Sequence, residues 1–293
     1  MKHRRRTAAW QLNLLLFPSA LILALFIIYP ALYSVYMSFT NEALVGPSAR
    51  DPSLVGFRNY LRLFGDAEFW NALYVTLVFV VGSAIIGQFV LGLASALALT
   101  RRIRFRSLFS VFILLPNAAP EVVAGFMWIS MLAGGDNATL SRIVMFFGIT
   151  PPDWLQVFPL WMIIIVNTWR GIATAMILLS AGLSTIPQDV LEAARIDGAR
   201  PFQIFRRITL PLMLPTIVLY MLISAVSTIA VFGLIYTLTR GGPGGATELV
   251  SIYIYNQSFT AFQLGYGAAV SVIVLLISMA IGIAYVRMMA VRV

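Results

Sequence analysis

The sequence contains no cysteine, and its only histidine and only lysine are His3 and Lys2. The lack of cysteine excludes disulfides, thiolate nucleophiles and cysteine metal sites. A serine or cysteine nucleophile paired with an interior histidine is excluded too. A P-loop needs a lysine after its glycines, and none is available. We therefore expect this chain to be no enzyme and to bind no cofactor, so any ATP that powers it must be bound by another chain.

Charged residues are also scarce, at 11% of the 293 residues, whereas soluble domains carry about 25%. Four long stretches have no charge at all: 7–41, 69–100, 208–239 and 249–286. A membrane-spanning helix needs roughly 20 apolar residues, and each stretch is longer than that. The composition therefore predicts an all-α polytopic membrane protein.

The apolar runs predict six membrane helices, at 12–39, 70–100, 106–133, 154–183, 209–238 and 266–288. On this prediction residues 1–11 form a tail and residues 12–293 form one transmembrane domain. Basic residues precede the first run, as in a signal peptide. Its apolar stretch is too long for one, however, and no A-x-A cleavage site follows promptly. We interpret the first run as a retained span.

The positions of lysine and arginine predict the orientation. Six spans place both termini on one side, where fourteen of these residues fall, against five on the other side. Cytoplasmic loops carry the excess of Lys and Arg, so both termini, the 101–106 turn and the 184–208 loop are expected inside. This topology accounts for the net charge of +9, and nucleic acid is not expected as a partner. The basic 101–106 turn is expected to contact membrane lipid headgroups.

The remaining loops, 40–69, 134–153 and 239–265, are expected outside. The last contains five consecutive turn-forming residues, Gly241 to Gly245. A glycine-rich run can cradle phosphate, but this one lacks a lysine, and we interpret it as a tight turn that needs φ > 0. The apolar positions that follow predict an amphipathic segment along the membrane surface: Leu249, Ile252, Tyr253, Asn256, Phe259 and Thr260.

The 184–208 loop holds the most informative pattern. Pro187 suits the first turn of a helix, and Asp189 and Glu192 place negative charge near its N-terminus. Asp197 and Gly198 form a natural stop because glycine adopts the left-handed conformation without strain. A helix this short is marginal in water by itself. We therefore expect it to pack into a groove on a partner.

This loop resembles the coupling loop of the inner-membrane permeases of binding-protein-dependent ABC importers. The pattern E-A-A-x-x-D-G-A-x-x-x-x-x-F-x-x-I-x-L-P-x-x-x-P runs without a break from Glu192 to Pro215. The resemblance implies a type I ABC importer transmembrane domain in the bacterial cytoplasmic membrane. It also implies a docking role on the ATP-binding subunit for Glu192, Ala193, Ala194, Asp197 and Gly198.

The resemblance extends to the carbohydrate-uptake branch of that family. It is carried by Gly56–Tyr60 with Phe69–Leu73, by Leu115-Pro116 with Pro120 and Trp128, by Thr239–Pro243 and by Tyr266–Ala269. It implies a sugar-like solute, two ATPase subunits that bind ATP and Mg, a second and related permease, and an external solute-binding protein. Relatives often carry Asn-Thr where this chain has Val75-Thr76, so no role is assigned there. The solute stays open between disaccharides, trehalose-like sugars and glycerophosphodiesters.

Polar residues at membrane depth are costly and usually face a cavity or a partner. Glu121 and Arg170 either line the solute path or form a buried ion pair, and both interpretations remain open. Arg170 with Asn167 and Trp169 is the first choice for solute contact. Tyr220, Ser224, Ser227 and Thr228 share one helical face, where they either line the path or pack between spans.

Two other classes of protein agree less well with the sequence. A secondary transporter driven by an ion gradient would need intramembrane carboxylates and inverted repeats, but only one carboxylate lies mid-span and no repeat is clear. A membrane-embedded enzyme is disfavoured by the missing histidine, cysteine and carboxylate pairs. Gly82, Gly87 and Gly92 are expected to allow close packing of the second span.

Overall fold

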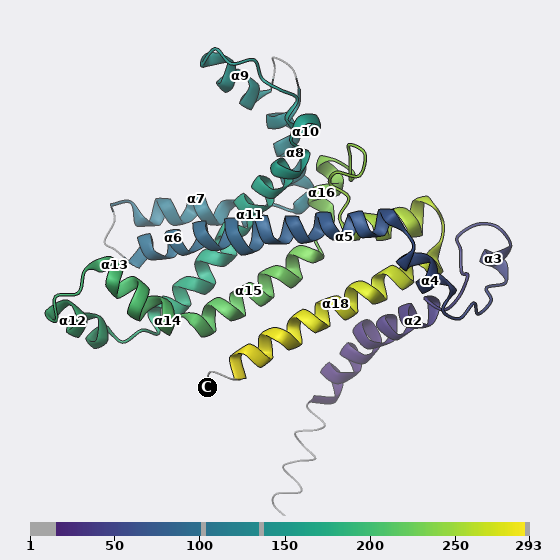
Figure 1. Cartoon of the computed structure of the whole chain (residues 1–293), viewed down its shortest axis with the longest axis horizontal. Coiled ribbons are helices and arrows are strands. Elements are labelled where there is room, and N and C mark those ends of the chain that lie inside the picture. The colour runs from purple at the N-terminus through teal and green to yellow at the C-terminus, as the bar shows by residue number, and fades with distance from the viewer. Residues whose placement is uncertain (1–15, 101–103, 135–137, 291–293) are drawn as a thin grey trace, which may run out of the picture. The chain divides into compact units, whose positions relative to one another are not determined.

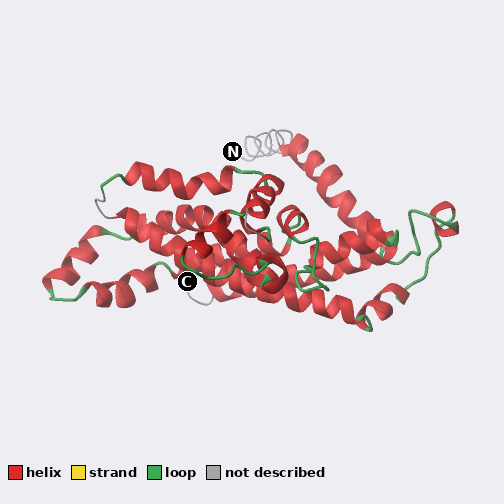
Figure 2. Ribbon diagram, turned by 90° about the horizontal axis from the view of Figure 1, so that it is seen from above, coloured by secondary structure: helices red, strands yellow, loops and turns green. Residues whose placement is uncertain are grey.

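A computed structural model describes residues 16–100, 104–134 and 138–290. The described residues form helices joined by loops (Figure 2), and their only β-type pairing is the isolated bridge between Thr40 and Leu54. The all-α fold is therefore confirmed. The predicted tail, 1–11, lies outside the described residues.

The chain forms two compact units. The smaller comprises Met1–Asp66 with Ile254–Leu276, and the larger comprises Ala67–Tyr253 with Ile277–Val293. Each unit is described by itself. The assignment of residues 12–293 to one permease domain stays a prediction.

The smaller unit contains one long apolar helix and a clasped loop. The helix runs from Leu16 to Met37 and includes η1 (Ala24–Ile28) and α2 (Tyr29–Met37), which confirms the described part of the first span. The loop after it carries α3 (Pro47–Arg50) and α4 (Arg58–Phe64). The Asn59 amide donates to the carbonyls of Ser38 and Thr40, each at 2.8 Å, and holds α4 against the end of α2. The unit also contains η4 (Asn256–Thr260) and the start of α18 (Leu264–Ala290), which confirms the sixth span as a helix.

The larger unit is built around two long helices that pack closely. The first combines α5 (Ala67–Phe79), η2 (Val80–Gln88) and α6 (Phe89–Thr100) in one continuous rod (Figure 1), so a helix covers the whole of the second predicted span. The other is α11 (Pro159–Ser184). A Cβ added to Gly87 or Gly92 would come within 2.4 Å of Thr168 Oγ1 or 2.3 Å of Ala175 Cβ. A Cβ added to Gly82 would lie 3.0 Å from Cδ1 at the end of the Ile164 side chain, which is a looser contact. The predicted close packing is therefore confirmed at Gly87 and Gly92.

The prediction of one continuous helix over 106–133 for the third span is wrong. The span consists of α7 (Arg106–Ala118) and α8 (Glu121–Leu132), which meet at a bend of 106°. Pro120 explains the break, because it has no N–H to donate and disfavours helical backbone at the residue before it. Ala119 accordingly has extended ψ of 132°.

The fourth and fifth spans also begin or end differently from the prediction. Residues Trp154–Val157 form a separate turn, α10, because Phe158 precedes Pro159 and leaves the helical region. The fifth span, predicted over 209–238, bends by 66° near Met213. The bent helix begins before the predicted span, with α13 (Pro201–Ile204) and η3 (Phe205–Thr209), and continues through α14 (Leu210–Leu212) and α15 (Leu214–Ile229). The end of the predicted span forms a separate helix, α16 (Gly233–Leu238). With each bent pair counted as one span, the described residues hold up to six.

The segment after the glycine-rich turn differs from its prediction as an amphipathic surface helix. Leu249, Ile252 and Tyr253 are fully buried inside the larger unit, next to and within α17 (Val250–Tyr255). The Thr76 hydroxyl accepts the backbone N–H of Val250 at 2.9 Å, which gives Thr76 a structural role. The glycine-rich run itself is confirmed as a turn, since Gly241, Gly244 and Gly245 all have positive φ. A further short helix, α9 (Thr139–Phe146), lies in the 134–153 loop.

Candidate functional site: an exposed coupling helix and a polar cavity

The predicted coupling helix is present as α12 (Gln188–Ile196). Pro187 stands one residue before its first turn, Asp189 lies in the first turn and Arg195 in the last, so both charges complement the helix dipole. Asp197 caps the C-terminus, and Gly198 follows with φ of 77°. A side chain at position 198 would be strained in this conformation. The helix and its stop therefore form as the sequence predicted.

One face of α12 is open and the other is anchored. Glu192, Ala193, Asp197 and Gly198 are exposed, and Ile196 is 86% exposed. Ala194 is buried, so of the five predicted docking residues it alone points into the chain. Leu191 packs against a cluster that contains Met213, Ile217 and Tyr220. This face of α12 is therefore packed against an apolar cluster that includes residues of α15.

A polar cavity of about 180 Å³ lies between η2, α8, α11 and α15. Six of the predicted solute-path residues line it: Glu121, Asn167, Arg170, Ser224, Ser227 and Thr228. Asn117, Thr174 and Gln88 also line it. Its polar lining is therefore made of amides, hydroxyls and one pair of opposite charges.

The pair of charges is an ion pair. Arg170 Nη1 donates to Glu121 Oε1 at 3.0 Å, with 21% and 33% of the two side chains exposed. Glu121 lies in the first turn of α8, at the break of the third span, so it is placed by the bend that the sequence analysis missed. The pair both lines the cavity and ties α8 to α11, so the two interpretations of these residues are compatible.

The other predicted residues are divided between cavity and core. Asn167 donates from Nδ2 to Ser83 Oγ at 2.9 Å. Trp169 does not line the cavity but packs edge-on against Trp128, with 5.5 Å between ring centroids. Tyr220 is also outside the lining and donates to the Ala84 carbonyl at 3.2 Å. Of the three residues of first choice for solute contact, Asn167 and Arg170 therefore line this cavity and Trp169 does not.

Gln88 is a site residue that the sequence analysis did not single out. Its Nε2 donates to the Asn167 carbonyl at 3.1 Å, and its Oε1 accepts from Ser224 Oγ at 3.0 Å. The side chain is 5% exposed and fits only because residue 171 is glycine, where a Cβ would lie 2.1 Å from Gln88 Cδ. Gln88 thus joins three membrane helices at the cavity. The signal for it was an amide inside the charge-free run 69–100, where polar groups are costly.

No group of histidine, cysteine, aspartate or glutamate in the described residues is placed to hold a metal ion.

Comparison with known families identifies the chain. Residues 88–290 match the family of binding-protein-dependent transport system inner membrane components. The chain belongs to this family. The match covers the polar cavity and all of α12, so both features lie in the family's shared region.

Similar proteins of this family align with this permease over almost its whole length. The Trehalose/maltose transport system permease protein MalF of Thermococcus litoralis is 32% identical over 276 residues, which is 94% of this chain and 92% of that protein. The Sulfoquinovosyl glycerol transport system permease protein SmoG of Agrobacterium fabrum is 34% identical over 285 residues, 94% of this chain and 88% of that protein.

Solved structures share the fold of the permease. A chain of a bacterial alginate ABC transporter, in complex with an alginate pentasaccharide-bound periplasmic protein, has a TM-score of 0.80 at 21% identity, covering 96% of this chain and 94% of that one. At this identity the likeness concerns the fold. The expected fold, an ABC importer transmembrane domain, is confirmed.

Proposed function

We propose that this permease forms the translocation path for a sugar or sugar-like solute across the bacterial cytoplasmic membrane, and that a separate ATPase drives it by docking on α12. ATP and Mg bind to the ATPase. A second, related permease completes the path, and an external binding protein delivers the solute. Both termini face the cytoplasm.

The observation that carries this proposal is the open face of α12. The helix has only nine residues, and isolated helices under about 12 residues are marginal in water. Its outward face, with Glu192, Ala193 and Ile196, is exposed and combines a charge with apolar side chains that a partner would cover. Family membership adds support, since α12 lies within the matched residues.

The anchored face of α12 supports a route from the ATPase to the cavity. Leu191 packs against the apolar cluster that holds Met213 and Tyr220. Tyr220 lies one helical turn before Ser224, which lines the cavity. A partner that moves α12 would thereby move α15, because packed side chains transmit displacement with little compression.

The solute class is supported by the cavity and by the relatives. Amides and hydroxyls dominate its polar lining, and the one carboxylate is neutralised by Arg170. Such groups suit the hydroxyls of a sugar-like solute. The relatives named above are permeases for trehalose or maltose and for sulfoquinovosyl glycerol.

Two substitutions on α12 test the docking role. We expect Glu192→Lys to reverse a charge at the centre of the exposed face, and Gly198→Pro to destroy the left-handed stop, since proline holds φ near −65°. Each variant should insert normally into the membrane but fail to co-purify the ATPase and lose uptake.

The matched control is Asp51→Lys, which makes the same change of charge at an exposed residue of the predicted outer loop. It should retain the ATPase. If both α12 variants transport solute normally, the docking assignment is refuted.

A further inference from the structure

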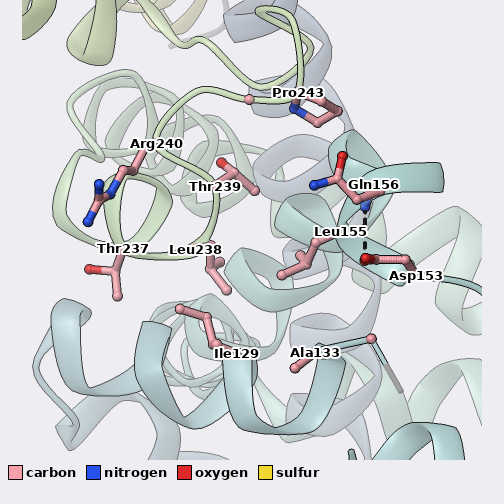
Figure 3. A pocket seen from close by; sticks show the side chains of 12 residues that line it. Ile129, Ala133, Asp153, Leu155, Gln156, Thr237, Leu238, Thr239, Arg240 and Pro243 are labelled. Atoms are coloured by element: carbon pink, nitrogen blue, oxygen red, sulfur yellow. Dashed lines mark hydrogen bonds between the residues drawn. The ribbon is translucent and has the colours of Figure 1, made fainter. Parts of the chain in front are cut away.

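A second and larger cavity lies in the larger unit, where α8, α10, α16 and the glycine-rich turn meet (Figure 3). Its volume is about 410 Å³, against about 180 Å³ for the central cavity. Small-molecule sites range from roughly 300 to 1,000 Å³. In this conformation the outer cavity is large enough for a small solute, and the central cavity is not.

The outer cavity has an apolar floor. Ile129 from α8, Leu155 from α10 and Leu238 from α16 point toward one another below the turn that carries Pro243 (Figure 3). Leu238 is buried, so the floor continues into the apolar core of this unit. A surface of this kind suits the C–H face of a sugar ring, because it removes apolar area from water.

Polar side chains line the cavity around this floor, and several of their donors and acceptors are available to a ligand. The Asp153 carboxylate accepts the backbone N–H of Gln156 at 3.3 Å through Oδ1. No other residue in the described ranges hydrogen-bonds the carboxylate, the Gln156 amide or the Arg240 guanidinium. One carboxylate and one guanidinium leave the lining without net charge. Together they offer donors and acceptors to a polyhydroxylated, uncharged ligand.

Hydrogen bonds hold the loop that carries Arg240 in a fixed conformation. The buried Thr247 hydroxyl lies 2.7 Å from both Thr239 Oγ1 and the Gly242 carbonyl. Arg240 has φ of 51°, a region that side-chain-bearing residues other than Asn and Asp rarely adopt. Arginine at a position that favours glycine or asparagine points to a use for its guanidinium.

We propose that the outer cavity is a second solute site, which holds an uncharged disaccharide before the central cavity expands to receive it. This inference rests on the proposed function, which places the cavity on the outer side of the membrane. In that topology the flanking loops, 134–153 and 239–265, are outside. The solute occupies Asp153, Gln156 and Arg240 first, and passes to the Gln88–Ser224 region when the ATPase moves α15.

Equilibrium dialysis with radiolabelled maltose and trehalose tests this site in the full-length protein, purified with the subunits that accompany it. We expect saturable binding of at least one sugar. The Asp153→Ala/Arg240→Ala variant should weaken binding at least tenfold. The Arg50→Ala/Asp51→Ala variant, which removes the same two kinds of charge at exposed residues of the predicted outer loop, should retain it.

Uptake gives a second readout that a folding defect would not mimic. The outer variant should raise the solute concentration for half-maximal uptake while the maximal rate is kept. Equal binding by wild type and outer variant overturns the second site, as does the absence of binding of either sugar to the wild type. Loss of the ATPase from the wild-type preparation, with sugar binding intact, would instead contradict the proposed function alone.

Discussion

At the scale of single residues, the central cavity depends on the space that one glycine leaves for a neighbouring side chain. Gly171 leaves room for the Gln88 side chain, whose amide links the Asn167 carbonyl to the Ser224 hydroxyl. A buried neutral hydrogen bond contributes about 1 kcal/mol, and a buried polar group that loses its partner costs more. Two such bonds on one side chain make Gln88 a positioning residue for this site.

The substitution Gly171→Ala tests that role without removing any polar group. Its Cβ would displace the Gln88 amide and release the Asn167 and Ser224 groups from their fixed positions. Loss of one hydrogen bond to the solute in consequence, about 1 kcal/mol, corresponds to roughly fivefold weaker solute binding. We expect the half-saturating solute concentration in uptake assays to rise by about that factor. Gln88→Leu, which keeps the volume and deletes the amide, should have a similar effect.

Gly182→Ala is the matched steric control on the same helix. Its Cβ would press on Thr216 of α15 instead of on Gln88. It should reduce stability comparably but leave the half-saturating concentration unchanged. If Gly171→Ala and Gly182→Ala behave alike in uptake, Gln88 is only a packing residue.

At the scale of helices, the sequence predicted where spans occur but not where they break. The charge-free run 69–100 forms part of one continuous helix because nothing inside it interrupts the backbone hydrogen bonds. The run 249–286 is interrupted at residues 261–263, where Phe262 has φ of 60°, before α18 begins at Leu264. The break at Pro120 was visible in the sequence, since a proline disfavours helix at the residue before it. The hydropathy around it is continuous, however, and hides the bend from a reading based on apolar runs.

The break between α15 and α16 could not be predicted in this way. The Val231 carbonyl, which lies in the break, accepts a hydrogen bond from Ser251 Oγ at 2.7 Å. That partner is twenty residues away and is brought close only by the fold. For the same reason Gln88 and Ser224 could not be paired from spacing, and Trp169 could not be recognised as a core residue against Trp128.

Close packing of α6 on α11 gives a prediction at this scale. Gly92→Leu would place a side chain where even a Cβ would lie 2.3 Å from Ala175. Overpacking costs about 1–3 kcal/mol or more, so we expect a lower midpoint of thermal unfolding in detergent. Gly282→Leu on α18 is the control, because a Cβ there meets no atom within 4 Å. Equal midpoints for the two variants would contradict the packing described.

At the scale of the whole molecule, this chain forms the translocation path in our proposal, and a separate subunit supplies the energy. An ion-driven transporter would need carboxylates within its spans. Glu121 is the carboxylate in the described central cavity, and it is committed to Arg170. The open face of α12, in contrast, has no partner within the described chain that covers it. The driving subunit is therefore expected to be a separate polypeptide at that face.

The absence of cysteine makes the decisive measurement clean, because one introduced thiol is the only one in the chain. Ala193→Cys places it on the open face of α12, and Ala49→Cys places a control in the predicted outer loop. With a membrane-impermeant thiol reagent, the account predicts labelling of Cys-substituted position 193 only in inside-out vesicles, and crosslinking there to the ATPase. Labelling of that position in right-side-out vesicles, or full uptake with no second polypeptide present, would contradict it.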